Sequence, residues 1–311
     1  MKTWTFSPAE FIPFRDRQAI EKVIRIRKKD MARHPNRDYR ITVMPDAEVG
    51  FRWVADMFRR IQAAAEAGRK VVLITPNPAR CYLQVAHLIN ASKVDCRHVY
   101  TFNMDEYADE EGRTPPESWP LGFMHAFKKY FYSAIEPKLR PPERQIRGPT
   151  TKNIADYGKM IADMGGADVC YSGPGWTGHL AFIEPDAPEF QAASLDDFLR
   201  MGPRVCRLSP FTIAQNSLHG SFGASGNLCA VPPMAATIGP AEVVGAKHRI
   251  DMHALTVQGS FTSWQRLTTR LCLHGPVTPR VPTSILQLLR TDVWVSESLA
   301  EDIQPRWEME Y

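Results

Sequence analysis

The chain has 311 residues, 44% of them hydrophobic and 23% charged, which is typical of globular proteins and excludes the disordered and fibrous classes. Its net charge of +4 arises largely near the N-terminus, where acidic residues interrupt the basic ones, so a solvated helical face is favoured over a nucleic-acid surface. The six cysteines stand singly, and the sequence shows neither a signal peptide nor an apolar run able to span a bilayer, so we expect a cytoplasmic protein that contacts neither nucleic acid nor membrane.

The first predicted elements lie between residues 51 and 89. Apolar residues recur at spacings of three and four, which predicts a helix that ends at Gly68; they are Phe51, Val54, Phe58, Ile61 and Ala65. The following run, VVLIT at 71–75, is rich in β-branched residues and predicts a strand buried on both faces of a parallel sheet. A second helix is predicted over 79–89.

Two later segments repeat this order of elements. HVYTFNMDEY, from His98, predicts a strand that runs into a loop, and DVCYSGPGWTG, from Asp168, predicts a strand followed by a Gly-rich turn. Alternating strands and helices indicate a parallel α/β sheet. We therefore expect a doubly wound, Rossmann-like, mainly parallel sheet with helices on both faces, formed by one domain over 39–311 after a basic N-terminal extension over 1–38.

Ligands of such sheets bind at the carboxyl ends of the strands, which directs attention to the loops that follow them. These loops are TPNPAR at 75–80, NMDEYADEEG from Asn103 and SGPGWTGH from Ser172. Asp105 and Glu106 fall where the second strand should end, and a carboxylate at that place can act as a general base. A turn or a helix cap is the alternative role for such an aspartate.

The Gly-rich turn carries the second candidate group. Its glycines let the backbone turn tightly and approach a ligand closely; they are Gly173, Gly175 and Gly178. His179 ends the turn and Glu184 follows five residues later. A carboxylate within reach of an imidazole fixes its tautomer and makes it a competent base. The alternative is a structural histidine beside a turn.

Three segments in this order resemble the glucosamine-6-phosphate deaminase/isomerase family: FNMDEY at 102–107, GHLAFIEP at 178–185 and AATIG at 235–239. The resemblance covers roughly residues 39–289 and leaves the first 38 without a counterpart. It implies a cofactor-free and metal-free enzyme that opens a sugar ring and moves a proton between C2 and C1, while an amino sugar becomes a ketose phosphate and ammonia leaves. It also implies a homo-oligomer.

The family's functional residues are assigned by the same resemblance. Asp105 matches the enolisation base, His179 the imidazole that assists ring opening, and Glu184 the carboxylate that holds this imidazole. The family's N-D-G-H turn is W-T-G-H here, so Thr177 replaces a carboxylate that assists ring opening. Trp176 can either stack on a sugar face or fill the space of the family's Asn.

The phosphate-binding end departs further from the family. Its P-T-G-G-T-P loop is TPNPAR here, without either glycine and with two prolines that lack the N–H a phosphate needs. Ile213 stands where the family has an Arg, and Thr262, aligned through Gly259 and Ser260, stands where it has a Lys. Lys247 is the alternative candidate for that Lys.

We therefore expect a sugar or sugar derivative that lacks the 6-phosphate or whose anion is held differently, with Arg80 as the replacement cation. The substrate-binding residues expected around it are Asn77, Arg80, Glu106, Gly173, Gly175, Trp176, Thr177 and Gly178. Two other functions remain open: a sugar sensor without catalysis, and a sugar lactonase, whose branch resembles GHxASLFP and lacks the carboxylate of Glu184. His274, in a Pro-rich turn before a helix, is expected to be structural.

Overall fold

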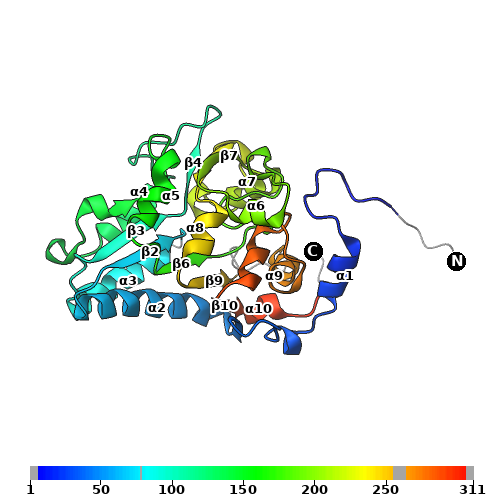
Figure 1. Ribbon diagram of the computed structural model, residues 1–311, viewed down its shortest axis with the longest axis horizontal. Helices are drawn as coiled ribbons and strands as arrows, with labels where there is room; N and C mark the ends of the chain where they lie inside the picture. The colour runs from blue at the N-terminus through cyan, green and yellow to red at the C-terminus, as the bar shows by residue number, and fades with distance from the viewer. Residues whose placement is uncertain (1–5, 78, 255–263, 306–311) are drawn as a thin grey trace.

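The computed structural model describes residues 6–77, 79–254 and 264–305. Its centre is a sheet in which every strand pairs in parallel with its neighbours (Figure 1). In spatial order the strands are β1 (Tyr39–Met44), β10 (Thr291–Ser296), β9 (Arg249–His253), β6 (Val169–Ser172), β2 (Val71–Thr75), β3 (Val99–Asn103) and β5 (Ile146–Arg147). The predicted parallel α/β class is confirmed.

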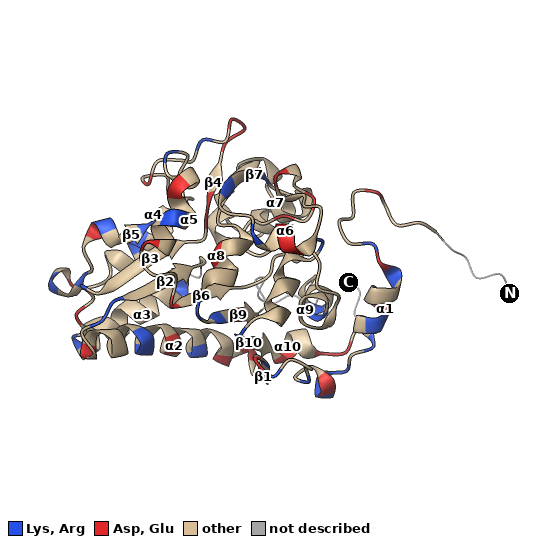
Figure 2. Ribbon diagram, in the orientation of Figure 1, with Lys and Arg blue, Asp and Glu red and all other residues tan. Residues whose placement is uncertain are grey.

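One face of the sheet is covered by α2 (Asp46–Glu66), α3 (Ala79–Ser92) and α4 (Phe123–Phe127), the last continued by a π-helical turn over Lys128–Tyr132. Their apolar side chains pack on alternate strand residues, as the pattern of each helix predicts. Trp53 lies at the centre of this layer, with ring centroids 5.3 Å from Tyr82 and 5.0 Å from Tyr171. α2 begins at Asp46, five residues before the predicted start, and mixes acidic and basic residues along its exposed side (Figure 2).

The other face carries a second apolar core and the remaining helices. These helices are α5 (Ile154–Ala162), α6 (Leu195–Leu199), α7 (Pro210–Ser217), α8 (Pro240–Gly245), α9 (Gln265–His274), α10 (Glu297–Ala300) and a 3-10 helix over Pro282–Leu288. The helix expected after the Pro-rich turn near His274 is thus a 3-10 helix. No helix in the described part of the chain is both long and apolar enough to cross a membrane.

A small antiparallel sheet stands beside the main sheet, formed by β4 (Asp105–Ala108), β8 (Met234–Thr237) and β7 (Arg204–Arg207). The prediction of a loop from Asn103 is therefore wrong for residues 105–108, because these residues form β4 directly after β3 ends. The cause is tertiary, because Asp105 pairs with Thr237, a residue far along the chain. Local pattern carries no signal for such a partner.

The segment before β1 lies against α9, where Figure 1 shows α1 (Arg17–Ile24) beside it. Val23 of α1 packs with Leu271 and Cys272. The fully buried Arg270 donates hydrogen bonds to the carbonyl of Arg266 in its own helix and to carbonyls from near both ends of the described chain, which belong to Ile26, Leu299, Ala300 and Glu301. A domain boundary at residue 38 stays a prediction.

Candidate active site

The Gly-rich turn begins where β6 ends and places His179 beneath its own loop. The N–H of Gly175 donates to the carbonyl of His179 at 3.2 Å, and the N–H of Gly178 donates to that of Gly175 at 2.9 Å. A β-carbon on Gly175 would come 1.9 Å from Nε2 of His179, and Gly178 has a φ of +77°. Glycine is therefore required at these two positions for different reasons, a close approach and a left-handed backbone. Gly173 likewise approaches a backbone oxygen, with a built β-carbon 2.7 Å from the carbonyl of Met252.

The structure brings His179 and Glu184 together. Nδ1 of His179 lies 3.3 Å from Oε1 of Glu184 and 3.0 Å from the hydroxyl of Thr212. The hydroxyl of Thr177 donates to Oε2 of Glu184 at 2.9 Å and lies 3.3 Å from Nδ1. The imidazole is 5% exposed and Glu184 is 0% exposed, so both are held in one buried network.

Electrostatics keep Glu184 ionised within this network. Burial acts to raise the pKa of Glu184, but attraction to His179 and the polar groups of His179, Thr212 and Thr177 around the carboxylate outweigh it, so the pKa lies below its usual value; among these groups the Thr177 hydroxyl donates the hydrogen bond. An ionised acceptor at Nδ1 favours the tautomer that carries its proton there. Nε2, which has no hydrogen-bond partner among the described residues, is then the nitrogen free to exchange a proton with a ligand.

Two residues of this network were missed by sequence reasoning. Thr212 lies in α7 and contacts Nδ1 of His179, and His219 lies just after the same helix. Burial and the nearby charge of His179 lower the pKa of His219 to about 4, and its Nε2 is buried without a partner. His219 is therefore neutral near pH 7. Only the packing of α7 over the turn reveals either residue.

Asp105 occupies the first position of β4 and is 7% exposed. Its carboxylate accepts no hydrogen bond from the described residues. Burial, followed by the charge of Glu106, raises the pKa of Asp105 well above its usual value. An unpaired, buried carboxylate of this kind is costly for the fold and typical of functional sites.

Asp105 lies close to the His179 turn through its strand partner. Thr237 pairs with Asp105, and its hydroxyl accepts a hydrogen bond from the N–H of Phe182 at 3.1 Å. The thiol of Cys206 has a pKa raised first by burial and then by carboxylates that include Glu184 and Asp105. Both candidate carboxylates therefore act on the same buried region.

The carboxylate of Glu106, which is expected to bind substrate, binds backbone amides of the protein instead. Its carboxylate accepts hydrogen bonds from the N–H groups of Tyr107, Phe123 and Met124 at 2.9, 3.0 and 2.8 Å. Phe123 and Met124 begin α4, so Glu106 satisfies the free amides of that helix. Burial nevertheless raises the pKa of Glu106.

The loop after β2 is shaped differently from a phosphate cradle. The hydroxyl of Tyr82 donates to the carbonyl of Pro76, and Thr75 donates to Oδ1 of Asn103 at 3.1 Å. Among the described residues, Oδ1 of Asn77 in this loop and Nδ2 of Asn103 at the end of β3 are buried without a partner, so the two strand ends offer one acceptor and one donor to a ligand. Arg80 is exposed in the first turn of α3 and forms no ion pair with a described residue.

Trp176 is 37% exposed and stacks on Trp264 with ring centroids 6.0 Å apart. The backbone N–H of Trp176 donates to the side-chain oxygen of Gln215 at 2.7 Å, and its backbone carbonyl accepts a hydrogen bond from the hydroxyl of Thr268 at 3.0 Å. One ring face is therefore covered by another tryptophan. Stacking of Trp176 on a sugar stays a prediction.

The remaining phosphate candidates do not gather at this site. Lys247 donates to Asp168 at 2.8 Å. Both residues precede their strands, β9 and β6, and so lie at the amino ends of the sheet, away from the candidate site at the carboxyl ends, which excludes Lys247 as the phosphate Lys. Ile213 packs against the apolar core. Gly259, Ser260 and Thr262 lie outside the described residues. His274 hydrogen bonds to the carbonyl of Met31 at 3.0 Å, in agreement with a structural role.

Within the described ranges, no group of three His, Cys, Asp or Glu side chains converges so as to hold a metal ion. Proton transfer is a reaction that the buried carboxylate of Asp105 and the oriented imidazole of His179 are suited to.

Comparison with known proteins finds relatives of one kind. A glucosamine-6-phosphate deaminase of Caenorhabditis elegans is 31% identical over 209 residues, which are 65% of this chain and 69% of that protein. Those of Mannheimia succiniciproducens and Phocaeicola vulgatus are each 29% identical, over 72% and 85% of this chain and 74% and 93% of their own lengths. A scan against protein-family models finds no match.

Solved structures share the fold. A monomeric glucosamine-6-phosphate deaminase superposes with a TM-score of 0.67 at 17% identity, covering 84% of this chain and 98% of its own. A 6-phosphogluconolactonase from Leishmania guyanensis superposes with a TM-score of 0.59 at 13% identity, covering 85% and 98%. At such identities these likenesses show the fold alone, whereas the sequence relatives show the family. The chain belongs to the glucosamine-6-phosphate deaminase family, of which it is a divergent member.

Proposed function

We propose that this protein is a cofactor-free sugar isomerase or deaminase in which Asp105 moves a proton between C2 and C1 of its substrate. One observation carries the proposal: the carboxylate of Asp105 is buried, accepts no hydrogen bond from the described residues and has a raised pKa, at a strand position joined through Thr237 to the segment between His179 and Glu184. A base of raised pKa is better matched to removing a proton next to a carbonyl at neutral pH.

Ring opening is the task proposed for His179. Nε2 takes the proton of the anomeric hydroxyl and returns a proton to the ring oxygen, which gives the open-chain aldehyde. Glu184, Thr212 and Thr177 hold Nδ1 and so fix the ring in place. Thr177 supplies a hydroxyl without charge, so this chain opens the ring with the imidazole alone.

Proton transfer then follows at Asp105. The ionised carboxylate removes the C2 proton and delivers it to C1, while the proton of the C2 hydroxyl passes to the C1 oxygen, which converts a 2-hydroxy aldehyde into a ketose. With an amino group at C2, a proton of the amine passes to the C1 oxygen instead, and an imine is left at C2. One water molecule hydrolyses the imine, and one ammonia is released.

The proposed substrate either lacks the 6-phosphate of glucosamine 6-phosphate or has an anionic group that this protein binds differently from the family. The loop after β2 has Pro76 in place of an amide donor, and Ile213 is half-buried against apolar residues where a cation is expected. A phosphate dianion needs several charge-assisted partners, and among the described residues this end of the site offers the single cation of Arg80.

The test is solvent deuterium exchange at C2, followed by NMR, for phosphorylated and unphosphorylated amino sugars, hexoses and sugar acids. We expect exchange with at least one sugar in the native protein and none with Asp105→Asn. The absence of exchange with every sugar would favour a sensor, and hydrolysis of a sugar lactone without exchange would favour a lactonase. Deamination of glucosamine 6-phosphate with ordinary family efficiency would contradict the proposed change of substrate.

A further inference from the structure

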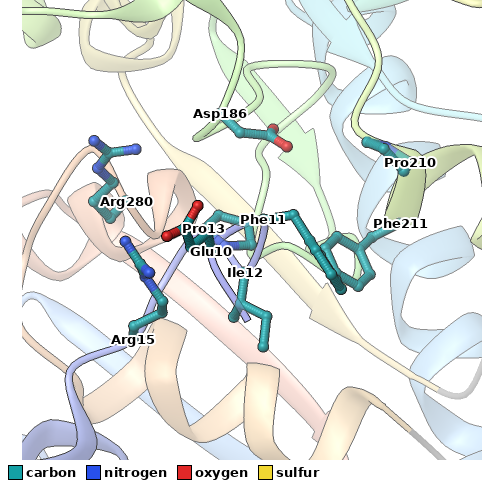
Figure 3. Close-up of a pocket in the computed structure, with 9 residues that line it drawn as sticks. All are labelled: Glu10, Phe11, Ile12, Pro13, Arg15, Asp186, Pro210, Phe211 and Arg280. Atoms are coloured by element: carbon teal, nitrogen blue, oxygen red, sulfur yellow. The ribbon is translucent and has the colours of Figure 1, made fainter. Parts of the chain in front are cut away.

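A pocket of about 440 Å³ lies between the N-terminal segment and the start of α7, and one of its walls comes from the first 38 residues, which have no counterpart in the family resemblance (Figure 3). Its walls include Glu10, Phe11 and Arg15 from the N-terminal segment, and Asp186, Phe211 and Arg280 from the body of the fold. This volume falls in the range of small-molecule sites.

One side of the pocket carries two cations. The guanidinium groups of Arg15 and Arg280 lie on the same side in Figure 3, with the carboxylate of Glu10 beside them. Neither arginine forms an ion pair with a described carboxylate, and Arg280 donates one hydrogen bond to the carbonyl of Pro185 at 3.2 Å. Guanidinium groups bind carboxylates and phosphates through paired hydrogen bonds.

Asp186 presents an acceptor to the pocket. Oδ2 of Asp186 accepts a hydrogen bond from Ser209 at 3.0 Å, while Oδ1 is buried and has no partner. A buried oxygen without a donor is the kind of group that a ligand hydroxyl or ammonium satisfies. The carboxylate of Asp186 therefore suits the donor end of a polar ligand.

Aromatic rings join the pocket to the candidate active site. The rings of Phe11 and Phe211 are 6.0 Å apart, and that of Phe211 is 5.8 Å from Trp176 in the Gly-rich turn. Phe211 also immediately precedes Thr212, whose hydroxyl contacts His179. The apolar floor of the pocket thus continues to the turn that holds the imidazole.

We propose that this pocket binds an acidic sugar, with its carboxylate or phosphate at Arg15 and Arg280, a hydroxyl or ammonium at Asp186, and an apolar ring face against Phe11 and Phe211. The arginines supply the anion recognition that the loop after β2 lacks. The acidic sugar is either the substrate or a separate effector, and the first of these rests on the proposed function.

Binding is measured on the full chain by calorimetric titration with gluconate, glucuronate and glucose 6-phosphate, with neutral glucose and inorganic phosphate as reference ligands. An acidic sugar should bind more tightly than glucose or phosphate alone. The double variant Arg15→Gln/Arg280→Gln should lose about tenfold or more in affinity, since hydrogen bonds to charged groups are strong. The matched control, Arg59→Gln/Arg69→Gln, removes two exposed arginines of the α2 region and should bind as the native protein does.

Steady-state kinetics distinguish whether the acidic sugar bound in the pocket is the substrate or a separate effector. If it is the substrate, the double variant raises KM with little change in kcat. If it is an effector, the variant keeps its KM and loses the effect of the acidic sugar on the rate. Either result supports the pocket.

Binding in Asp105→Asn separates the two proposals, because that variant removes the proposed base and leaves the pocket unchanged. Arginine-dependent binding without any C2 exchange in the native protein would overturn the proposed function and leave the pocket standing. Equal affinity of the native protein and the Arg15→Gln/Arg280→Gln variant for every acidic sugar, or no binding of any at millimolar concentration, overturns the pocket.

Discussion

Nε2 of His179 lies so close to Gly175 that a β-carbon at that position would come within 1.9 Å of it. The φ of Gly175 is not in the left-handed region, so the requirement for glycine is steric. The imidazole and the turn above it therefore form one packed unit.

Gly175→Ala is expected to displace the imidazole and lower kcat by about a hundredfold, since misplacement by about 1 Å has effects of that size. The measurement is the rate of C2 exchange at saturating substrate. Gly220→Ala is the control, because a β-carbon on Gly220 meets no atom within 4 Å. Unchanged kcat in Gly175→Ala, with an intact fold, would remove His179 from the mechanism.

Thr177→Val removes the donor to Oε2 of Glu184 while preserving the size of the side chain. A buried carboxylate oxygen left without a donor costs about 1–3 kcal/mol, and the free energy of unfolding should fall by that amount. Urea denaturation at pH 7 measures it. Thr177→Ser keeps the hydroxyl and should retain most of the stability, so equal losses in both variants would show that the methyl group, rather than the hydrogen bond, matters.

Asp105→Asn is expected to abolish exchange and to increase stability. The folded-state pKa of Asp105 is raised, so its ionisation destabilises the fold as pH increases from its unfolded value towards the folded one. Relative to the native protein, the free energy of unfolding of the variant should increase by about 1.4 kcal/mol for each pH unit between the unfolded-state and folded-state pKa values of Asp105. Below pH ~3.9 the unfolding free energies of the two proteins should become equal. Unfolding free energies between pH 3 and 8 test this expectation. A variant less stable than the native protein at pH 7 would contradict it.

The same raised pKa predicts the pH dependence of the rate. Asp105 acts only when ionised, so kcat/KM should rise with pH through a value well above the ordinary aspartate pKa of about 3.9. A pH profile of C2 exchange for the best substrate shows the position of this limb. A rate that stays level down to pH ~4.5 would mean that another group takes the C2 proton.

Much of the fold could be predicted because its signals are local. The β-branched run of β2 and the apolar face of α2 each lie within one short segment, and their strand and helix were found with shifts only at the ends. The contact between His179 and Glu184 could also be predicted, because the two residues are five positions apart across one turn and so stay within reach of each other.

The rest depends on residues far apart in the sequence. Asp105 belongs to a strand only because Thr237 lies opposite it, and Glu106 caps α4 because Phe123 and Met124 fold back over it. Thr212 reaches His179 through the placement of α7. Such pairings follow from the assembled fold and leave no periodic pattern in the chain.

Arg270 joins segments from near both ends of the chain. Its guanidinium donates hydrogen bonds to the carbonyl of Ile26 and to those of Leu299 and Ala300. A chain truncated before residue 299 would keep every strand of the main sheet and leave this buried guanidinium without the acceptors at Leu299 and Ala300. Because a buried charge without acceptors is costly, such a truncation is expected to weaken the packing of α9 against the segment that carries the arginine-lined pocket.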